Sequence, residues 1–311
     1  MARRIRFIPP GSLVEVSCRT VQGRFLLRPS PLLRDIVLGV LGRAQARFQV
    51  EIHAFTFLSN HYHLLLTARD ALQLAGFMGF VNSNLAREAG RVYEWRERFW
   101  GRRYQAMVVS DEESAQIARL KYVLAQGCKE GLVRRPAEWP GAHTAEALAN
   151  GTDLEGWWFD RTREYIASRS GKLFGAYEFA SLQGVSLTPL PCWRMLDGEE
   201  RKARVQGLLL SIEAERASET AATGREPLGS RHVERQHPHS QAMPLRRTPS
   251  PPFHANSKTM RKSFLLAYRD FLAAFRSAAE RLKRSGNAVD FPPGSFPPAL
   301  GWVPEPDPAP A

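Results

Sequence analysis

The sequence predicts an α+β domain over residues 1–145, with an antiparallel sheet of about four strands and covering helices. Two observations predict it: some segments alternate apolar and polar side chains, and longer ones repeat apolar side chains every three or four positions. Along the chain these segments follow the order β-α-β-β-α-β-α. Such an order favours an antiparallel sheet with helices packed on it.

The first half of this domain contains three predicted strands and one helix. Residues 13–19 alternate as a half-buried strand does. A helix is predicted from Leu32 to Phe48, with a proline in its first turn and one apolar stripe, formed by Leu33, Ile36, Val37, Val40 and Leu41. Residues 51–58 and 61–67 predict two strands, and the Ser-Asn pair between them predicts a tight hairpin turn.

The second half adds a helix, a strand and a further helix. Asp70 begins a helical pattern that extends to about Tyr93. Residues 98–110 alternate again and predict the fourth strand. The acidic run at 111–113 is typical of a helix start, because carboxylates stabilise the positive end of the helix dipole. This last helix is predicted to reach about Lys129.

Beyond residue 145 the pattern predicts three further segments. Residues 146–215 predict a small aromatic and helical subdomain, with helices near 160–170 and 198–215. Residues 216–257 are rich in Ser, Arg, Pro, His and Gln without periodicity, which predicts a disordered linker. Residues 258–311 predict a helix with an apolar stripe, followed by a proline-rich tail.

The composition narrows the class of protein. The chain has 311 residues, and 43 Lys and Arg against 31 Asp and Glu give a net charge of +12, which favours a polyanionic partner. It contains no apolar stretch of about 18 residues that would span a membrane, and no secretory signal is visible. The three cysteines form no CxxC pair, so neither a disulfide framework nor a cysteine-rich zinc site is expected. We therefore expect a cytoplasmic protein.

The most informative motif is His61-Tyr62-His63 on the third predicted strand. Alternate residues of a strand point to one face, so both imidazoles project together while Tyr62 points the other way. Two adjacent imidazoles are ready ligands for a divalent metal, although such a pair also occurs as ordinary packed or hydrogen-bonded histidines. A second motif of the same spacing, His237-Pro-His239, lies in the predicted linker, and we expect no function for it.

A helix offers the groups that would complete such a site. Tyr122 and Gln126 are four residues apart on the last predicted helix and share a face. His61, His63 and Gln126 would form a three-ligand, open-sided metal site, and Tyr122 would face a bound phosphorus as a nucleophile. The alternative is that Tyr122 is a core residue of an amphipathic helix.

These residues lie in segments that resemble a known family. Segments 59–66 (SNHYHLLL), 99–105 (FWGRRYQ) and 121–133 (KYVLAQGCKEGLV) resemble the single-tyrosine HUH transposases, in particular the REP-associated tyrosine transposase branch. The resemblance covers residues 5 to about 145. It implies a ferredoxin-like HUH endonuclease fold, a cut in single-stranded DNA that depends on Mg²⁺ or Mn²⁺, a 5′-phosphotyrosine on Tyr122 and a released 3′-hydroxyl. Many relatives carry Asn-Pro-Val where this chain has Gln126-Gly-Cys, and glutamine keeps an amide oxygen at that position.

Basic and aromatic side chains surround these motifs and suit single-stranded or hairpin DNA. The candidate DNA-binding residues are Arg98, Arg102, Arg103, Lys121, Lys129 and Arg134. Each cluster alone is equally typical of a solvated face, and Arg3, Arg4 and Arg6 are a further candidate arm. The resemblance leaves open a monomer or a homodimer. Two alternatives to a transposase remain: a domesticated relative that binds a hairpin without cutting it, and a metal phosphodiesterase that uses water.

Overall fold

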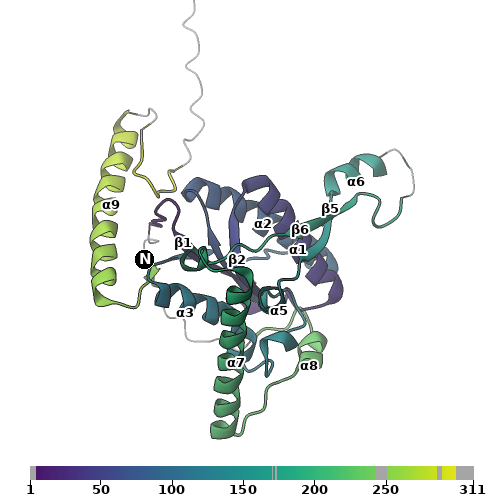
Figure 1. Cartoon of the computed structure of the whole chain (residues 1–311). Helices are drawn as coiled ribbons and strands as arrows, with labels where there is room; N and C mark the ends of the chain where they lie inside the picture. Colours follow the sequence, from purple (N-terminus) through teal and green to yellow (C-terminus); the bar gives the residue numbers. More distant parts are fainter. Residues whose placement is uncertain (1–4, 170, 172–173, 243–250, 286–288, 299–311) are drawn as a thin grey trace, which may run out of the picture.

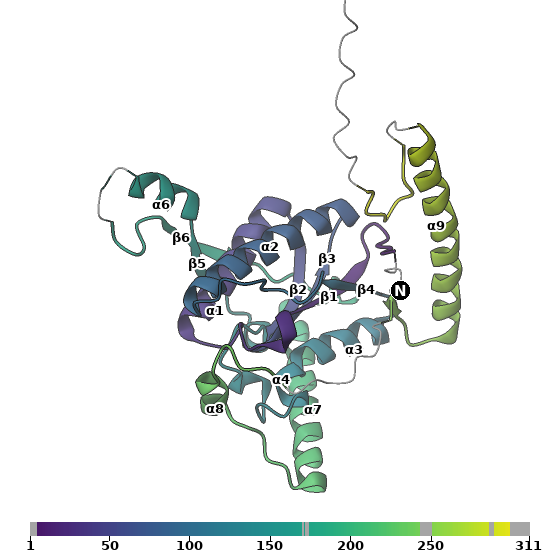
Figure 2. The same ribbon diagram turned by 180° about the vertical axis from the view of Figure 1, so that it is seen from behind.

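A computed structural model describes residues 5–169, 171, 174–242, 251–285 and 289–298 of the chain (Figures 1 and 2). Within these residues one five-stranded sheet has the order β2-β3-β1-β4-β7. Its strands are β1 (Leu13–Arg19), β2 (Glu51–Phe57), β3 (His61–Thr67), β4 (Gln105–Val109) and β7 (Phe253–His254). The first four pair antiparallel, which confirms the predicted α+β class and antiparallel sheet. The short β7 pairs parallel to β4 and was not predicted.

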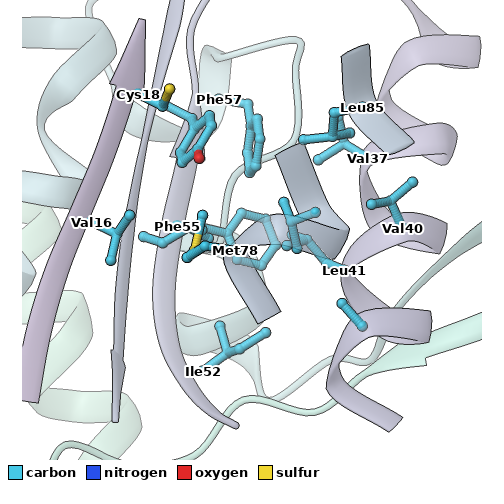
Figure 3. Packing of buried hydrophobic residues seen from close by; sticks show 14 of the residues in the cluster. Val16, Cys18, Val37, Val40, Leu41, Ile52, Phe55, Phe57, Met78 and Leu85 are labelled. Atoms are coloured by element: carbon cyan, nitrogen blue, oxygen red, sulfur yellow. The ribbon is translucent and has the colours of Figure 1, made fainter. Parts of the chain in front are cut away.

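Helices cover both faces of the sheet. One face packs on α1 (Pro31–Phe48) and α2 (Ala71–Val92), and the other on α3 (Glu113–Leu124), α4 (Gln126–Lys129) and α7 (Gly198–Thr223). Figure 3 shows the first of these cores, where Val16 and Phe55 from the strands face Leu41 and Met78 from the helices. Side chains of β3 alternate between the two cores, so neighbouring residues on this strand serve different faces.

The helix starts follow the predicted signals. The hydroxyl of Ser30 accepts the Leu33 N–H at the start of α1, where Pro31 occupies the first turn. The carboxylate of Asp70 does the same for the Gln73 N–H at the start of α2. Both caps satisfy backbone donors that have no partner inside the helix.

The predicted helix over 111–129 is wrong in one detail, since it is divided into α3 and α4 at Ala125. The backbone N–H of Ala125 still bonds to the Lys121 carbonyl, and that of Lys129 bonds to the Ala125 carbonyl. Because turn-to-turn hydrogen bonds continue through the junction, Tyr122 and Gln126 remain one helical turn apart.

The C-terminal half contains more regular structure than the sequence predicts. It comprises α5 (Ala145–Asn150), β5 (Leu154–Phe159), α6 (Arg161–Ser168), β6 (Ala180–Val185), α7, α8 (Ser230–Arg235) and α9 (Lys258–Ser285). In the described chain as a whole, short 3-10 turns lie at Val21–Gly23, Pro136–Glu138 and Pro191–Trp193. The helices expected near 160–170 and 198–215 are present. The antiparallel pair β5 and β6 was not predicted, because the aromatic residues of β5 form a continuous run that does not alternate with polar residues.

The expectation of a disordered linker over 216–257 is corrected in part. Residues 216–223 extend α7, and the segment also holds α8 and β7. Its backbone is fixed by distant partners: the Phe25 N–H bonds to the Ser240 carbonyl, and the Ala242 N–H to the Gly23 carbonyl. Residues 243–250, most of the proline-rich tail (299–311), and Arg3 and Arg4 of the candidate arm lie outside the described residues.

Two parts project from this body on opposite sides, namely α9 and the arm formed by β5, β6 and α6 (Figures 1 and 2). The arm packs on α1, and Phe7 stacks on Phe271 of α9 with ring centroids 4.4 Å apart. The predicted division of the chain into four segments stays a prediction. Leu154 and Val185, beyond residue 145, contribute to the first core, and Val205 and Ile212 to the second. In the described part of the chain, no helix has both the length and the hydropathy that crossing a membrane requires.

Candidate active site

Both histidines of the first motif project from the start of β3 toward the face that carries α3. Their ring centroids lie 5.2 Å apart. Tyr62 lies on the opposite face, where it is fully buried and its hydroxyl donates to Asn82 on α2 at 2.7 Å. The alternation of a β-strand therefore separates the two imidazoles from the phenol between them.

The protein holds the Nδ1 atom of each imidazole. For His61 the partner is the Asn60 side-chain oxygen at 2.6 Å, and Asn60 is itself oriented because its amide nitrogen donates to the Gly23 carbonyl. For His63 the partner is a carboxylate oxygen of Glu15 at 2.8 Å. An oxygen acceptor at Nδ1 favours the tautomer that carries the proton there and leaves the Nε2 lone pair available to a metal.

The pKa values of His61 and Glu15 are shifted in the direction that suits metal binding, for which the imidazole must be neutral. Burial lowers the pKa of His61 well below its usual value, and the neighbouring His63 and Arg19 lower it further, so His61 is neutral at pH 7. Burial alone would raise the pKa of Glu15. The hydrogen bond from His63 and the charges of His63 and Arg119 outweigh that burial and hold this pKa below its ordinary value.

Tyr122 of α3 lies directly beside the histidine pair in the same chain. Its ring centroid is 5.5 Å from that of His63. The guanidinium carbon of Arg119 lies 4.0 Å from the centre of the Tyr122 ring, and the Lys129 ammonium 4.4 Å. Gln126, buried at the start of α4, donates from its amide nitrogen to the Tyr122 carbonyl at 2.9 Å, which leaves the amide oxygen to act as a ligand.

Three cavities adjoin these residues. The first, of about 140 Å³, is lined by both histidines together with Ser17, Cys18, Arg19, Arg102, Arg103 and Gln105. The second, of about 450 Å³, separates Tyr122 and Lys129 from α7. The third, of about 490 Å³, is rich in aromatic and arginine side chains and shares Cys18, Arg102 and Arg103 with the first. Cationic walls of this kind suit a phosphate backbone.

The six candidate DNA-binding residues are placed differently. Arg102 and Arg103 line the histidine cavity, and Lys129 lies over the Tyr122 ring. Arg98 lines the third cavity, where its Nε donates to the Trp100 carbonyl. Acidic side chains engage the remaining two, since Lys121 pairs with Glu215 of α7 and Arg134 pairs with Glu226.

Sequence reasoning missed Glu15 and Asn60. No local pattern indicated Glu15, because its burial, at only 5% exposed, becomes visible only in the folded sheet. A buried carboxylate requires a partner, and the strand register that supplies His63 was not readable from the sequence. Asn60 was predicted only as a turn residue.

The second histidine motif, His237 and His239, has the same ring separation as the first, but its imidazoles have different partners. The rings of His237 and His239 are also 5.2 Å apart. Here Nε2 of His239 contacts the Tyr93 carbonyl at 2.7 Å, and His237 is exposed. Across the residues that the structure describes, no group of three His, Cys, Asp or Glu side chains could hold a metal. A site at His61 and His63 therefore needs its third donor from another residue type, and the Gln126 amide is the candidate.

Imidazole nitrogens and an amide oxygen are donor types that bind divalent cations. Histidine and amide ligands bind several divalent metals, and the remaining coordination positions of a bound metal would be available to phosphate oxygens.

Residues 30–126 match the family model described as "Transposase IS200 like". A solved structure of a REP-associated tyrosine transposase bound to a REP hairpin is 16% identical, covering 49% of this chain and 87% of that one, with a TM-score of 0.39. A putative transposase from Deinococcus radiodurans R1 is 18% identical over 38% of this chain and 95% of that one, with a TM-score of 0.28. No curated protein matched. The matched residues 30–126 contain both histidines, Tyr122 and Gln126, and over these residues the chain is similar to the IS200-like transposase family.

Proposed function

We propose that this protein is a transposase that cuts and rejoins single-stranded DNA next to a hairpin, with Tyr122 as the nucleophile and with His61, His63 and Gln126 as ligands of Mg²⁺ or Mn²⁺. The observation that carries the proposal is the contact between the Tyr122 and His63 rings, 5.5 Å apart within one chain. A nucleophile and a metal-binding pair that touch need no partner subunit or hinge to bring them together.

In the proposed reaction the Tyr122 oxygen attacks the scissile phosphorus. The new bond joins the phenol oxygen to phosphorus, and the bond between phosphorus and the 3′-oxygen breaks. The 3′-oxygen takes up a proton and leaves as a hydroxyl, while the phenol proton passes to solvent. A metal bound at this site supplies Lewis-acid stabilisation of the phosphate charge. Attack by a 3′-hydroxyl on the phosphotyrosine reverses these changes and restores the phosphodiester without ATP.

The chain's own residues would position the substrate. Arg102 and Arg103 line the cavity beside the histidines and would bind the DNA backbone. The aromatic side chains of the adjoining cavity, which include Trp100 and Tyr104, offer surfaces on which bases stack. We infer hairpin-associated DNA from the resemblance of segments 59–66 and 121–133 to the REP-associated branch.

The test is a search for a covalent adduct. The protein is incubated with Mn²⁺ and a labelled single-stranded hairpin oligonucleotide, and an adduct that survives denaturation is expected for the wild type. Tyr122→Phe removes the attacking oxygen and abolishes the adduct. Tyr62→Phe is the matched control: it removes a phenol oxygen on the opposite face, costs about 1 kcal/mol of stability through its bond to Asn82, and leaves the adduct intact.

The other outcomes point to other functions. An adduct that persists in Tyr122→Phe overturns the nucleophile assignment. Cleavage without any adduct identifies a phosphodiesterase that uses water. Binding of the hairpin with neither cleavage nor adduct identifies a domesticated binding protein.

A further inference from the structure

We propose that Glu15 and Arg119 are positioning residues that connect the metal-binding imidazole of His63 to the ring of Tyr122. The effect of these two residues on catalysis rests on the proposed function, whereas the contacts among the four side chains do not depend on it. In the order of contact the connection runs from His63 through Glu15 and Arg119 to Tyr122, across β3, β1 and α3. Metal binding and the nucleophile would thereby be held in one fixed arrangement.

Glu15 uses both carboxylate oxygens. One accepts from Nδ1 of His63 at 2.8 Å, and the other contacts the Arg119 guanidinium. The side chain is 5% exposed and lies on β1, the strand that pairs with β3. With both oxygens engaged, the carboxylate has one orientation, and the imidazole that donates to it is held with Nε2 directed away from Glu15.

Arg119 provides the second half of the connection. It precedes Tyr122 by three residues on α3, a spacing that places both side chains on one face of the helix. Its guanidinium carbon lies 4.0 Å from the centre of the Tyr122 ring. A planar guanidinium can donate to a carboxylate while it stacks on an aromatic ring, and a lysine cannot combine those contacts.

An ordinary buried ion pair would look similar in part, and the chain contains one for comparison. Glu88 of α2 is also 5% exposed and pairs with Arg161 at 2.6 Å. Both Glu88 oxygens bond to that arginine, and among the described residues Glu88 forms no hydrogen bond to a histidine or to Tyr122. Glu15 differs because it divides its two oxygens between an arginine and a candidate metal ligand. Glu88→Gln is therefore the matched control for Glu15→Gln.

The first experiment measures the metal-free protein. Glu15→Gln keeps the size of the side chain but offers one acceptor and one donor, so it cannot accept from both His63 and Arg119. We expect the imidazole ¹⁵N NMR signals of His63 to show a smaller population protonated at Nδ1, and the ring signals of Tyr122 to shift. Glu88→Gln, with a comparable loss of thermal stability, should leave both sets of signals unchanged.

The second experiment measures Mn²⁺ binding by calorimetry. Loss of a partner that orients a ligating histidine typically weakens metal affinity about 10- to 100-fold, and we expect a change of that size for Glu15→Gln. Arg119→Lys should retain the affinity to within about threefold and lower the rate of adduct formation at saturating Mn²⁺. Should Glu15→Gln fail to fold, Glu15→Asp, which keeps the carboxylate but shortens its reach, is measured in the same way.

The outcomes separate the two proposals. The positioning role is overturned if Glu15→Gln loses thermal stability to the same extent as Glu88→Gln, while the His63 signals, the Tyr122 signals and the Mn²⁺ affinity all stay at wild-type values. If those three readouts change as expected but the wild type forms no adduct, the positioning role is supported and the proposed function fails.

Discussion

His61 and His63 illustrate how the surroundings of a side chain decide whether it is a candidate metal ligand. The same spacing occurs at His237 and His239, with rings at the same separation. What differs is the partner at each Nδ1 atom. Oxygen acceptors from Asn60 and Glu15 orient the first pair, whereas His237 accepts from a backbone N–H at 3.3 Å.

This difference gives a prediction for the two motifs. His63→Ala removes one proposed metal ligand and should lower Mn²⁺ affinity and adduct formation at least about 10- to 100-fold, since even loss of a partner behind a ligand costs that much. His237→Ala removes the same side chain from the exposed motif and should leave both quantities unchanged. Calorimetry with Mn²⁺ and the adduct assay measure the two effects. Equal losses in both variants would contradict the assignment of the metal site to β3.

The candidate DNA-binding cations differ in their surroundings, since some line a cavity at the candidate site and some pair with an acidic side chain. Arg103 lines the histidine cavity, whereas Arg134 pairs with Glu226. Arg103→Gln should weaken binding of single-stranded DNA and reduce the slope of log affinity against log salt by about 0.7, the value for one phosphate contact. Arg134→Gln should change neither by a comparable amount. Fluorescence anisotropy across a salt series measures both, and an unchanged slope for Arg103→Gln would exclude its contact with phosphate.

At the scale of elements, the arm is attached to the body by backbone contact. A Cβ atom on Gly39 of α1 would lie 2.2 Å from the carbonyl carbon of Trp157, and one on Gly156 of β5 would lie 2.2 Å from the carbonyl oxygen of Asp35. Glycines on both surfaces therefore let a helix and a strand pack closer than side chains allow. This contact is what places β5 and β6 against α1.

Gly39→Ala should consequently force the two elements apart and destabilise the fold by about 1–3 kcal/mol, the usual cost of overpacking. Gly207→Ala is the control, because Gly207 is exposed within α7 and a Cβ there meets nothing within 4 Å. Alanine is the better helix former, so this variant should gain roughly 0.5–1 kcal/mol. Denaturant unfolding measures both, and a neutral Gly39→Ala would show that the close approach is not required.

At the scale of the whole molecule, buried histidines should make stability depend on pH. Burial lowers the pKa of His143 to about 4, and it lowers that of His53 as well. The backbone fixes His143 as neutral: Nδ1 accepts the Ala145 N–H, and Nε2 donates to the Leu124 carbonyl. Below about pH 6.5, His143 therefore binds a proton in the unfolded chain but stays neutral in the folded chain until the pH approaches 4.

The sign follows from this difference. Stability contributed by His143 is fully present above pH 6.5 and is lost as pH falls toward 4, by at most about 3 kcal/mol. His143→Gln keeps a donor and an acceptor but removes the titration, so the decline in unfolding free energy over this range should become shallower. Denaturant unfolding at a series of pH values measures it, and an identical slope in the variant would rule out His143 as a source.

The amino-acid sequence specified the order of strands and helices in residues 13–129, because hydrophobic periodicity and capping signals are local. It also determined that His61 and His63 share a face that Tyr62 does not, since strand alternation is fixed by backbone geometry. The conformation of residues 236–242 was not readable, because this segment is held by hydrogen bonds to the loop near Gly23 rather than by its own periodicity.

The groups that contact the candidate site residues from behind were set by tertiary packing. Glu15, His63 and Tyr122 belong to three elements separated by dozens of residues, and the pairing of β1 with β3 and the packing of α3 on the sheet bring them into contact. A sequence encodes such contacts through the free energy of the whole packed core, so no local pattern announces them. Residue types and their facing directions were local facts, and the connection from His63 through Glu15 and Arg119 to Tyr122 was a property of the fold.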